Sequence, residues 1–140
     1  MLKFFQEWKE KKALGSQRKE FYAEMKKNLE SFYVMDQLGK LRFFKLEICE
    51  KLKKVDLHFP ESVLTYFQSL QNYNDSLQDF KDYEQWYTTD INQKTPDNAK
   101  ALHEKKEQAQ NQFSGLEKII KSAIKDWEAR LKEMGLLKKT

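Results

Sequence analysis

Apolar residues recur at alternating intervals of three and four along residues 95–136, which is the spacing of a helix that packs in a bundle. Both ends of this stretch carry helix signals. Thr95 can cap the first turn, Pro96 suits the first helical position, and Gly135 can end the helix in a left-handed conformation. The pattern predicts one helix of about 40 residues, roughly 60 Å long, with Gly115 as its weak point. Its seam positions are Ala99, Leu102, Lys106, Ala109, Phe113, Leu116, Ile120, Ala123, Trp127, Arg130 and Met134.

A second helix with the same spacing is predicted over residues 60–88. Its seam is Val63, Tyr66, Leu70, Tyr73, Leu77, Phe80, Glu84 and Tyr87. Residues 88–94 are polar and form a short link, so the two flanking helices should run antiparallel. With the link centred near residue 93, facing residue numbers sum to about 186. This register places Tyr73 against Phe113 and Phe59 against Trp127.

Residues 16–56 carry a less regular pattern, which resumes on both sides of a stutter at Gly39. Gly39 could end one helix and precede another, or a single long helix could carry a kink there. Because no proline or cluster of turn residues interrupts the stretch, we predict one kinked helix. Pro60 disfavours helix at the residue before it and therefore separates this helix from the next.

Residues 1–15 form a short amphipathic helix in this interpretation, with Met1, Phe4, Phe5 and Trp8 on one face. The apolar pattern then fails, and Gly15–Ser16 is predicted to be a hinge or break.

The predicted fold is therefore all-α: an antiparallel bundle of three long, coiled-coil-like helices over residues 16–140, preceded by the N-terminal helix of residues 1–15. The long helices are expected at about 16–56, 60–88 and 96–135. In shape the arrangement resembles spectrin-like three-helix units and, less closely, BAR-type bundles; no family motif accompanies the resemblance.

Charge is distributed unevenly along the 140 residues. Residues 1–56 carry a net charge of +5, residues 57–95 carry −4, and residues 96–140 carry +3. An acidic segment between two basic ones is expected to neutralise part of the positive charge within the fold. The overall charge of +4 is therefore weak support for nucleic-acid binding.

The single cysteine, Cys49, excludes an intramolecular disulfide, and its place in a helical pattern predicts a small buried side chain. The sequence contains no apolar run near the length of a membrane-spanning helix. The N-terminal residues do not read as a signal peptide, because charges interrupt the apolar ones at once. The expected compartment is the cytoplasm.

Motifs for catalysis are missing from the sequence. The four glycines are widely separated, neither His58 nor His103 follows a glutamate by three residues, and no paired cysteines occur. We expect no enzymatic activity, no catalytic residues, no cofactor, no metal site and no small-molecule substrate.

Two groups of charged residues have more than one interpretation. Asp75, Asp79 and Asp82 share a helix face, which could bind a cation or a basic partner but more simply faces solvent or the basic helices. Glu84 and Lys106 fall on seam positions, where they could pair with each other or mark where the bundle opens.

The candidate partner-binding residues are Phe4, Phe5, Trp8, Lys9, Lys12 and Trp86. The first five combine aromatic side chains with lysines on the N-terminal helix. Trp86 lies off the strict seam. These features predict a non-enzymatic protein–protein interaction module that binds a protein partner or itself, as an adaptor, a chaperone or a structural subunit. Two alternatives remain: nucleic-acid binding through the basic residues of 9–54, and attachment to a membrane surface through residues 1–14.

Overall fold

The computed structural model describes residues 2–56 and 58–138. Its elements are α1 (Leu2–Leu38), α2 (Glu47–Val55), α3 (Glu61–Thr89), a short 3-10 turn η1 (Ile91–Gln93), α4 (Pro96–Ser114) and α5 (Leu116–Glu133). No strand occurs within these two ranges. The prediction of an all-α fold is confirmed.

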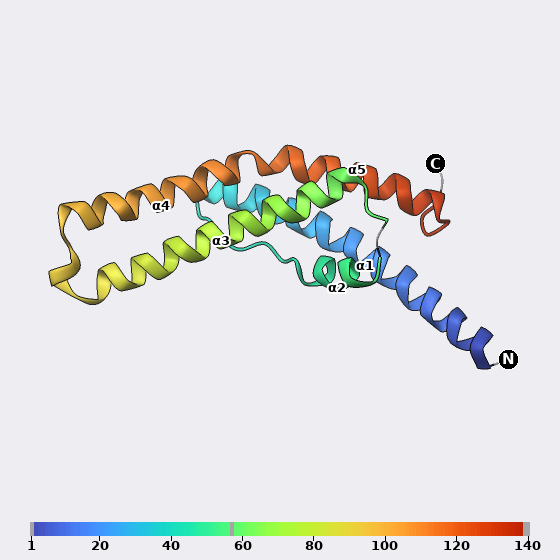
Figure 1. Cartoon of the computed structure of the whole chain (residues 1–140). Helices are drawn as coiled ribbons and strands as arrows, with labels where there is room; N and C mark the ends of the chain where they lie inside the picture. The colour runs from blue at the N-terminus through green and yellow to red at the C-terminus, as the bar shows by residue number, and fades with distance from the viewer. Residues whose placement is uncertain (1, 57, 139–140) are drawn as a thin grey trace.

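Three long rods make up the elongated body: α1, α3, and α4 followed by α5 (Figure 1). α3 packs along both α4 and α5, and α1 packs along α5. The η1 turn reverses the chain at one end of the molecule, so that α3 and α4 form an antiparallel hairpin (Figure 1). The predicted pairing holds for two aromatic layers: Tyr73 lies 6.0 Å from Phe113, and Phe59 stacks on Trp127 at 5.5 Å between ring centroids.

α1 runs parallel to α3, so the predicted antiparallel arrangement of the three long helices is wrong for this pair. Contacts between them keep an offset of 38 residues: Asn28 bonds Tyr66, and the Tyr73 hydroxyl, which donates to the Arg42 carbonyl, lies 3.9 Å from the Met35 sulfur. The same offset joins Arg18 to Asp56 at the end of α2. Two consecutive parallel rods require the chain to return between them. Residues 40–46, here called the strap, and α2 make this return along the side of α1 (Figure 1).

The core lies where all three rods overlap. Aromatic residues fill it. The fully buried Phe21 contacts three of them, with ring centroids 6.1 Å from Tyr66 and 5.4 Å from Trp127, both fully buried, and 6.2 Å from Phe59, which is partly buried. The Trp127 indole N–H donates to the Arg18 carbonyl at 3.1 Å, so this buried polar group has a hydrogen-bond partner. These contacts hold the middle of α1 against the start of α3 and the end of α5.

The predicted break at Gly15–Ser16 is wrong, because α1 continues through both residues. Gly15 is buried, and a Cβ on it would lie 3.2 Å from Leu136 Cδ2. The glycine therefore permits a close approach of the C-terminal segment to the helix. A single glycine inside a helix costs only about 1 kcal/mol, which neighbouring turns readily offset.

The predicted kinked helix over residues 16–56 is also wrong. α1 ends at Leu38, and Gly39 adopts a left-handed conformation with φ 65°. The Lys40 N–H donates to the Met35 carbonyl at 3.2 Å, which is the pattern of a Schellman cap. The alternative in which Gly39 ends one helix is the correct one.

Side chains from α1 and α3 bond the backbone of the strap and of the first turn of α2. The Asn74 amide donates to the Phe44 carbonyl and accepts from the Phe44 N–H, both at 3.0 Å. The Glu24 carboxylate accepts from the Ile48 and Cys49 N–H groups, each at 3.1 Å, and so satisfies the first turn of α2. These long-range bonds give the backbone groups of Phe44, Ile48 and Cys49 the partners that a continuous helix would otherwise supply.

The long C-terminal helix predicted over residues 95–136 is interrupted at Gly115, which separates α4 from α5. The predicted ends are confirmed. The Thr95 hydroxyl accepts from the Asn98 N–H at 3.2 Å, Gly135 has φ 74°, and the Leu136 N–H donates to the Leu131 carbonyl at 2.8 Å.

Candidate interaction surfaces

The first surface is the N-terminal part of α1, residues 2–13, here called the arm. Every residue of the arm is exposed, and Figure 1 shows these turns extending beyond the other helices. Leu2 is 89% exposed, Phe4 74%, Phe5 58% and Trp8 51%. Large apolar side chains are rarely left this open over consecutive turns unless they meet a partner.

Lysines lie beside the aromatic rings of the arm. Lys9 Nζ lies 5.5 Å from the Phe5 ring centroid, and Lys12 Nζ lies 5.1 Å from that of Trp8. The Phe5 and Trp8 rings are themselves 6.0 Å apart. Five of the six predicted partner-binding residues, including Phe4, thus gather on one short helical segment with an apolar face and a cationic border.

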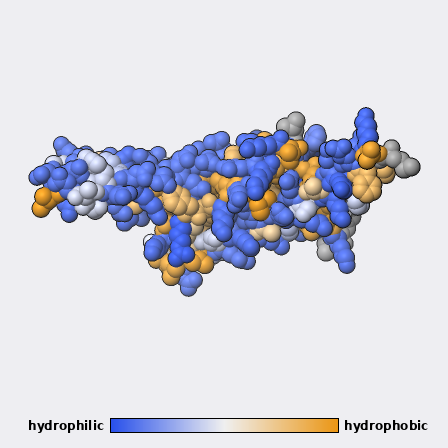
Figure 2. Space-filling view, turned by 90° about the horizontal axis from the view of Figure 1, so that it is seen from below, coloured by the Kyte–Doolittle hydropathy of each residue, from blue (hydrophilic) through white to orange (hydrophobic). Residues whose placement is uncertain are grey.

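The sixth residue, Trp86, lies near the end of α3, at the opposite end of the molecule from the arm (Figure 1). It is 44% exposed, and its ring lies 5.2 Å from that of Tyr83. Ile91 in η1 is 80% exposed. Figure 2 shows apolar atoms at both ends of the elongated body.

The hairpin end is open because α1 stops short of it. By the constant offset of 38 residues, the last residue of α1, Leu38, lies level with Ser76. The α3 seam residues up to this level, from Val63 to Tyr73, and Leu77 one residue past it are at most 1% exposed. Beyond it, the corresponding residues Phe80 and Tyr87 are only half-buried. We call residues 80–106 the hairpin tip.

Within the seams of α3 and α4, charged residues occur only beyond the end of α1, where the third rod is missing. Glu84 and Lys106 are both exposed, and no ion pair joins them among the described residues. Lys105 instead bonds Asp79 at 2.7 Å and lies over the Tyr83 ring. Of the two interpretations of Glu84 and Lys106, the one in which they mark the opening of the bundle agrees with this geometry.

The three aspartates of α3 have neighbours within the chain. Asp75 accepts from Gln71 at 3.1 Å and Asp82 from Gln78 at 2.8 Å, while Asp79 bonds Lys105 of α4. No group of three or more histidine, cysteine or acidic side chains is arranged to hold a metal ion in residues 2–56 and 58–138.

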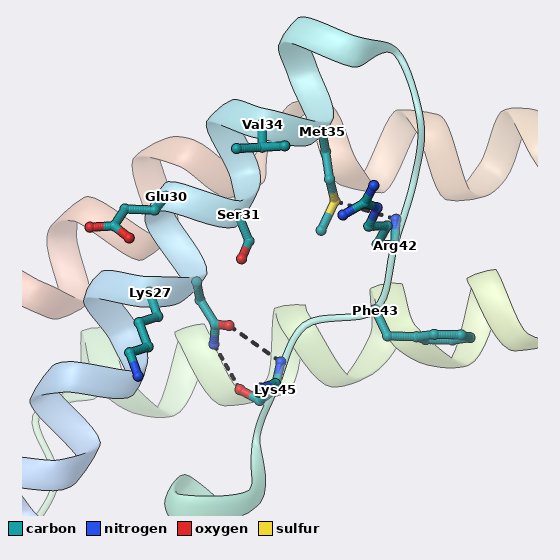
Figure 3. Close-up of a pocket in the computed structure, with 9 residues that line it drawn as sticks. Lys27, Glu30, Ser31, Val34, Met35, Arg42, Phe43 and Lys45 are labelled. Carbon is teal, nitrogen blue, oxygen red and sulfur yellow. Dashed lines mark hydrogen bonds between the residues drawn. The ribbon is translucent and has the colours of Figure 1, made fainter.

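A third surface, which the sequence did not indicate, is a groove of about 420 Å³ between α1 and the strap. It was missed because residues 40–46 were expected to be helical. Figure 3 shows the lining residues of α1 on one side of the groove and Arg42, Phe43 and Lys45 of the strap on the other. The Asn28 amide bonds both backbone groups of Lys45. The other lining residues are Lys27, Glu30, Ser31, Val34, Met35, Arg42 and Phe43.

The buried titratable groups lie in the core rather than at these surfaces. Cys49 is buried as predicted, and burial raises the pKa of its thiol to about 12. Burial also raises the pKa of Glu24, and the nearby Glu47 and Glu50 add to this, although two backbone N–H bonds oppose it. Burial alone would raise the pKa of Asp56, but bonds from Arg18 and the His58 N–H outweigh it and lower that pKa.

Comparisons with known proteins found no matching family, no similar curated protein and no similar solved structure. Among the described residues, no helix has the length and apolar character needed to cross a membrane.

Proposed function

We propose that this chain is a non-enzymatic protein–protein interaction module and that the arm is its docking element. The observation that carries the proposal is the exposure of Leu2, Phe4, Phe5 and Trp8 on a helix whose remaining length is packed. Burial of apolar surface contributes roughly 25 cal/mol per Å². A partner helix or groove that covers this face would therefore gain substantial binding free energy.

The geometry suits helix-in-groove recognition. In that mode an amphipathic helix presents apolar anchors at intervals of three and four to an apolar groove. Phe4, Phe5 and Trp8 have this spacing, and Lys9 and Lys12 lie beside them. The lysines favour a groove with an acidic border, because opposite charges increase the association rate and the specificity.

The test compares the whole chain with a Phe5→Ser/Trp8→Ser variant. Complexes are purified from the native host, their masses are measured, and binding is then reconstituted with the purified partner. We expect the variant to bind at least about tenfold more weakly, the size of effect typical of aromatic anchor residues, with unchanged thermal unfolding.

A Gln6→Ser/Glu10→Ser variant of the same helix is the matched control. Equal binding by all three proteins would exclude the arm as the docking element. Arm-dependent binding to anionic vesicles but to no protein would favour the membrane-surface alternative.

A specific observation also favours nucleic-acid binding as a second candidate. Lys27, Arg42 and Lys45 line the groove beside the strap, with Glu30 as its only lining carboxylate. Phe43 is 40% exposed, and Lys81 Nζ lies 4.9 Å from its ring centroid, so a base that stacked on this ring would also meet a cation. Fluorescence anisotropy with labelled single-stranded RNA at about 50 mM salt tests this. Binding that is lost in Arg42→Glu/Lys45→Glu but retained in Lys100→Glu/Lys125→Glu would support it, and no binding by the wild type would exclude it.

A further inference from the structure

A single turn at Gly39 connects α1 to the rest of the chain. Gly39 has φ 65°, and the Lys40 N–H donates to the Met35 carbonyl across the turn. Residues 37–46 contain no proline and no second glycine, and Leu38, Lys40 and Leu41 are residues that favour helix. The reversal of the chain at this point therefore depends locally on one glycine.

The contacts that hold α1 in place come from residues far beyond the turn. We call the strap and α2 to α5 together the base. The Phe21 ring of α1 lies 5.4 Å from the Trp127 ring of the base, and Arg18 Nε lies 2.7 Å from Asp56 Oδ2. None of these contacts requires that both partners belong to the same copy of the chain. The base of one copy therefore offers α1 of a second copy the same site that its own α1 occupies.

We infer that two copies of this chain form a closed dimer by exchanging their α1 helices. The turn at Gly39 opens in each copy, and α1 leaves its own base and packs on the base of the other. The surfaces that meet are the ones that already fit each other in the monomer. Because each copy gives one α1 and receives one, the assembly has two-fold symmetry and stops at two copies. Such a dimer carries two arms, which strengthens binding to any partner that has two sites.

Apolar side chains beside the turn suit this arrangement. Leu38 is 63% exposed and Val34 is 44% exposed on the last two turns of α1. In the exchanged dimer the two opened turns pass each other near the two-fold axis, so these side chains should meet those of the other copy. Only the residues of the turn need to change conformation, since the contacts of α1 with a base are kept.

Gly39→Ala tests the role of the turn. A Cβ at this position would meet no atom within 4 Å, so the substitution changes no packing contact. It makes the left-handed turn unfavourable and a continued helix more favourable. Each protein is unfolded in urea and refolded at concentrations up to hundreds of micromolar, and the masses are measured by size-exclusion chromatography with light scattering. We expect a wild-type dimer fraction that grows with concentration, and a dimer dissociation constant at least about tenfold lower for Gly39→Ala, since both turns are relieved.

Two further glycine variants serve as controls. Gly115→Ala changes a position with φ −93°, within the base, and should dimerise like the wild type. Gly39→Asn should also stay close to the wild type, because asparagine tolerates the left-handed conformation. If Gly39→Ala forms no more dimer than the wild type or than Gly115→Ala, the exchange is overturned.

A pair of charge variants shows whether α1 itself is exchanged. Arg18 lies on α1 and Asp56 follows the last residue of α2, so the exchange would move this ion pair from one chain to between two chains. Arg18→Asp and Asp56→Arg each bring like charges together, both in the monomer and in a dimer of one variant. In an exchanged dimer of one copy of each, opposite charges meet at both interfaces.

We expect the two charge variants, refolded together, to form a heterodimer that neither forms alone. The control is one chain with both substitutions, which restores the opposite pair and should fold and associate like the wild type. A mixture that gives no heterodimer, although this control folds, would overturn the exchange.

The arm variant separates the exchange from the proposed function. Phe5→Ser/Trp8→Ser changes exposed side chains outside the contacts between α1 and the base, so it should dimerise to the same extent as the wild type. Loss of the dimer in this variant would show that two arms hold it together, and would overturn the exchange of α1. Loss of partner binding alone would support the proposed function and leave the dimer intact.

Discussion

Residues 2–13 and residues 14–38 belong to one continuous helix, α1. The two parts differ in which side of the helix bears apolar side chains. In the packed part, the positions that face the core are Phe21, Met25, Asn28, Phe32 and Met35. Stepping back by heptads from these residues leads to Lys11 and Glu7 in the arm, where only Phe4 is apolar. Phe4 lies at the edge of this face and shares a second, apolar face with Phe5 and Trp8.

This difference shows that the arm is not an extension of the core left without a cover. If it were, its apolar residues would continue the seam of the packed part. Instead, the face that would meet α3 and α5 turns charged at Lys11 and Glu7, and the apolar side chains Phe4, Phe5 and Trp8 gather on a face rotated away from it. The two parts of α1 therefore have separate roles: one stabilises the fold, and the other presents a surface.

The largest expected contrast is between two phenylalanines of this helix. Phe21 is fully buried against three aromatic rings, so Phe21→Ala should lower the free energy of unfolding by about 3–5 kcal/mol. Phe5→Ala, at an exposed position, should change it by less than about 0.5 kcal/mol. Urea unfolding followed by circular dichroism measures both. A large loss for Phe5→Ala would mean that the arm packs on its own chain, which would contradict the comparison.

A smaller effect is expected at Asn28, which joins the packed part to the strap and to α3. Its amide donates to the Lys45 carbonyl and to the Tyr66 hydroxyl, both at 2.7 Å. Asn28→Ala leaves buried polar groups unpaired and should cost about 2–3 kcal/mol. Faster amide exchange at Lys45 should accompany the loss. Gln6→Ala in the arm is the control and should be neutral; unchanged exchange at Lys45 in Asn28→Ala would show that this amide does not hold the strap.

The Arg18–Asp56 bond lies near the boundary between the two parts and adds a dependence on pH. Because the pKa of Asp56 is below its ordinary value of 3.8, its stabilising effect is complete above that value. The effect is lost as the pH falls through the lowered pKa. We expect Arg18→Gln to cost about 1–2 kcal/mol at neutral pH, and the difference from the wild type to shrink below about pH 4. A difference that stays constant between pH 7 and pH 2.5 would exclude the ionised Asp56 as its source.

The smallest expected effects concern Gly115, at the junction of α4 and α5, and Gly15, inside α1. At Gly115, the nearest atom to an added Cβ would be the Gln112 carbonyl oxygen at 4.0 Å, so Gly115→Ala should stabilise by about 0.5–1 kcal/mol. At Gly15 the same gain in helix propensity is opposed by the contact with Leu136. Gly15→Ala should therefore gain less than Gly115→Ala in thermal unfolding. Equal gains would show that Leu136 moves aside at no cost, and that the start of the packed part is less constrained than the geometry indicates.

Much of the hairpin could be predicted from the sequence because its signals are local. The caps at Thr95 and Gly135 use groups within a few residues, and two regular seams set the pairing of Tyr73 with Phe113. The strap could not be predicted, because the groups that hold it come from far along the chain. Asn74, for example, bonds Phe44 across 30 residues.

The candidate surfaces were predictable only in part, for a similar reason. Phe4, Phe5 and Trp8 lie within two helical turns, so local spacing was enough to place them together. Where Trp86 lies relative to the arm depends on the parallel arrangement of α1 and α3, which in turn depends on the unpredicted return of the chain. Gly15 was wrongly predicted to break the helix. Its close contact is with Leu136, far along the chain, and leaves no signal in the neighbouring residues.

The positions of the three tryptophans give the protein a built-in set of fluorescence reporters. Trp127 is fully buried and should emit at short wavelength, shielded from quenchers. Trp8 and Trp86 are about half exposed, at opposite ends of the molecule, and should emit at longer wavelength and respond to iodide. Single replacements by phenylalanine assign each signal. Covering of the arm, covering of the hairpin tip and unfolding of the core can then be followed as separate spectral changes in one unlabelled sample.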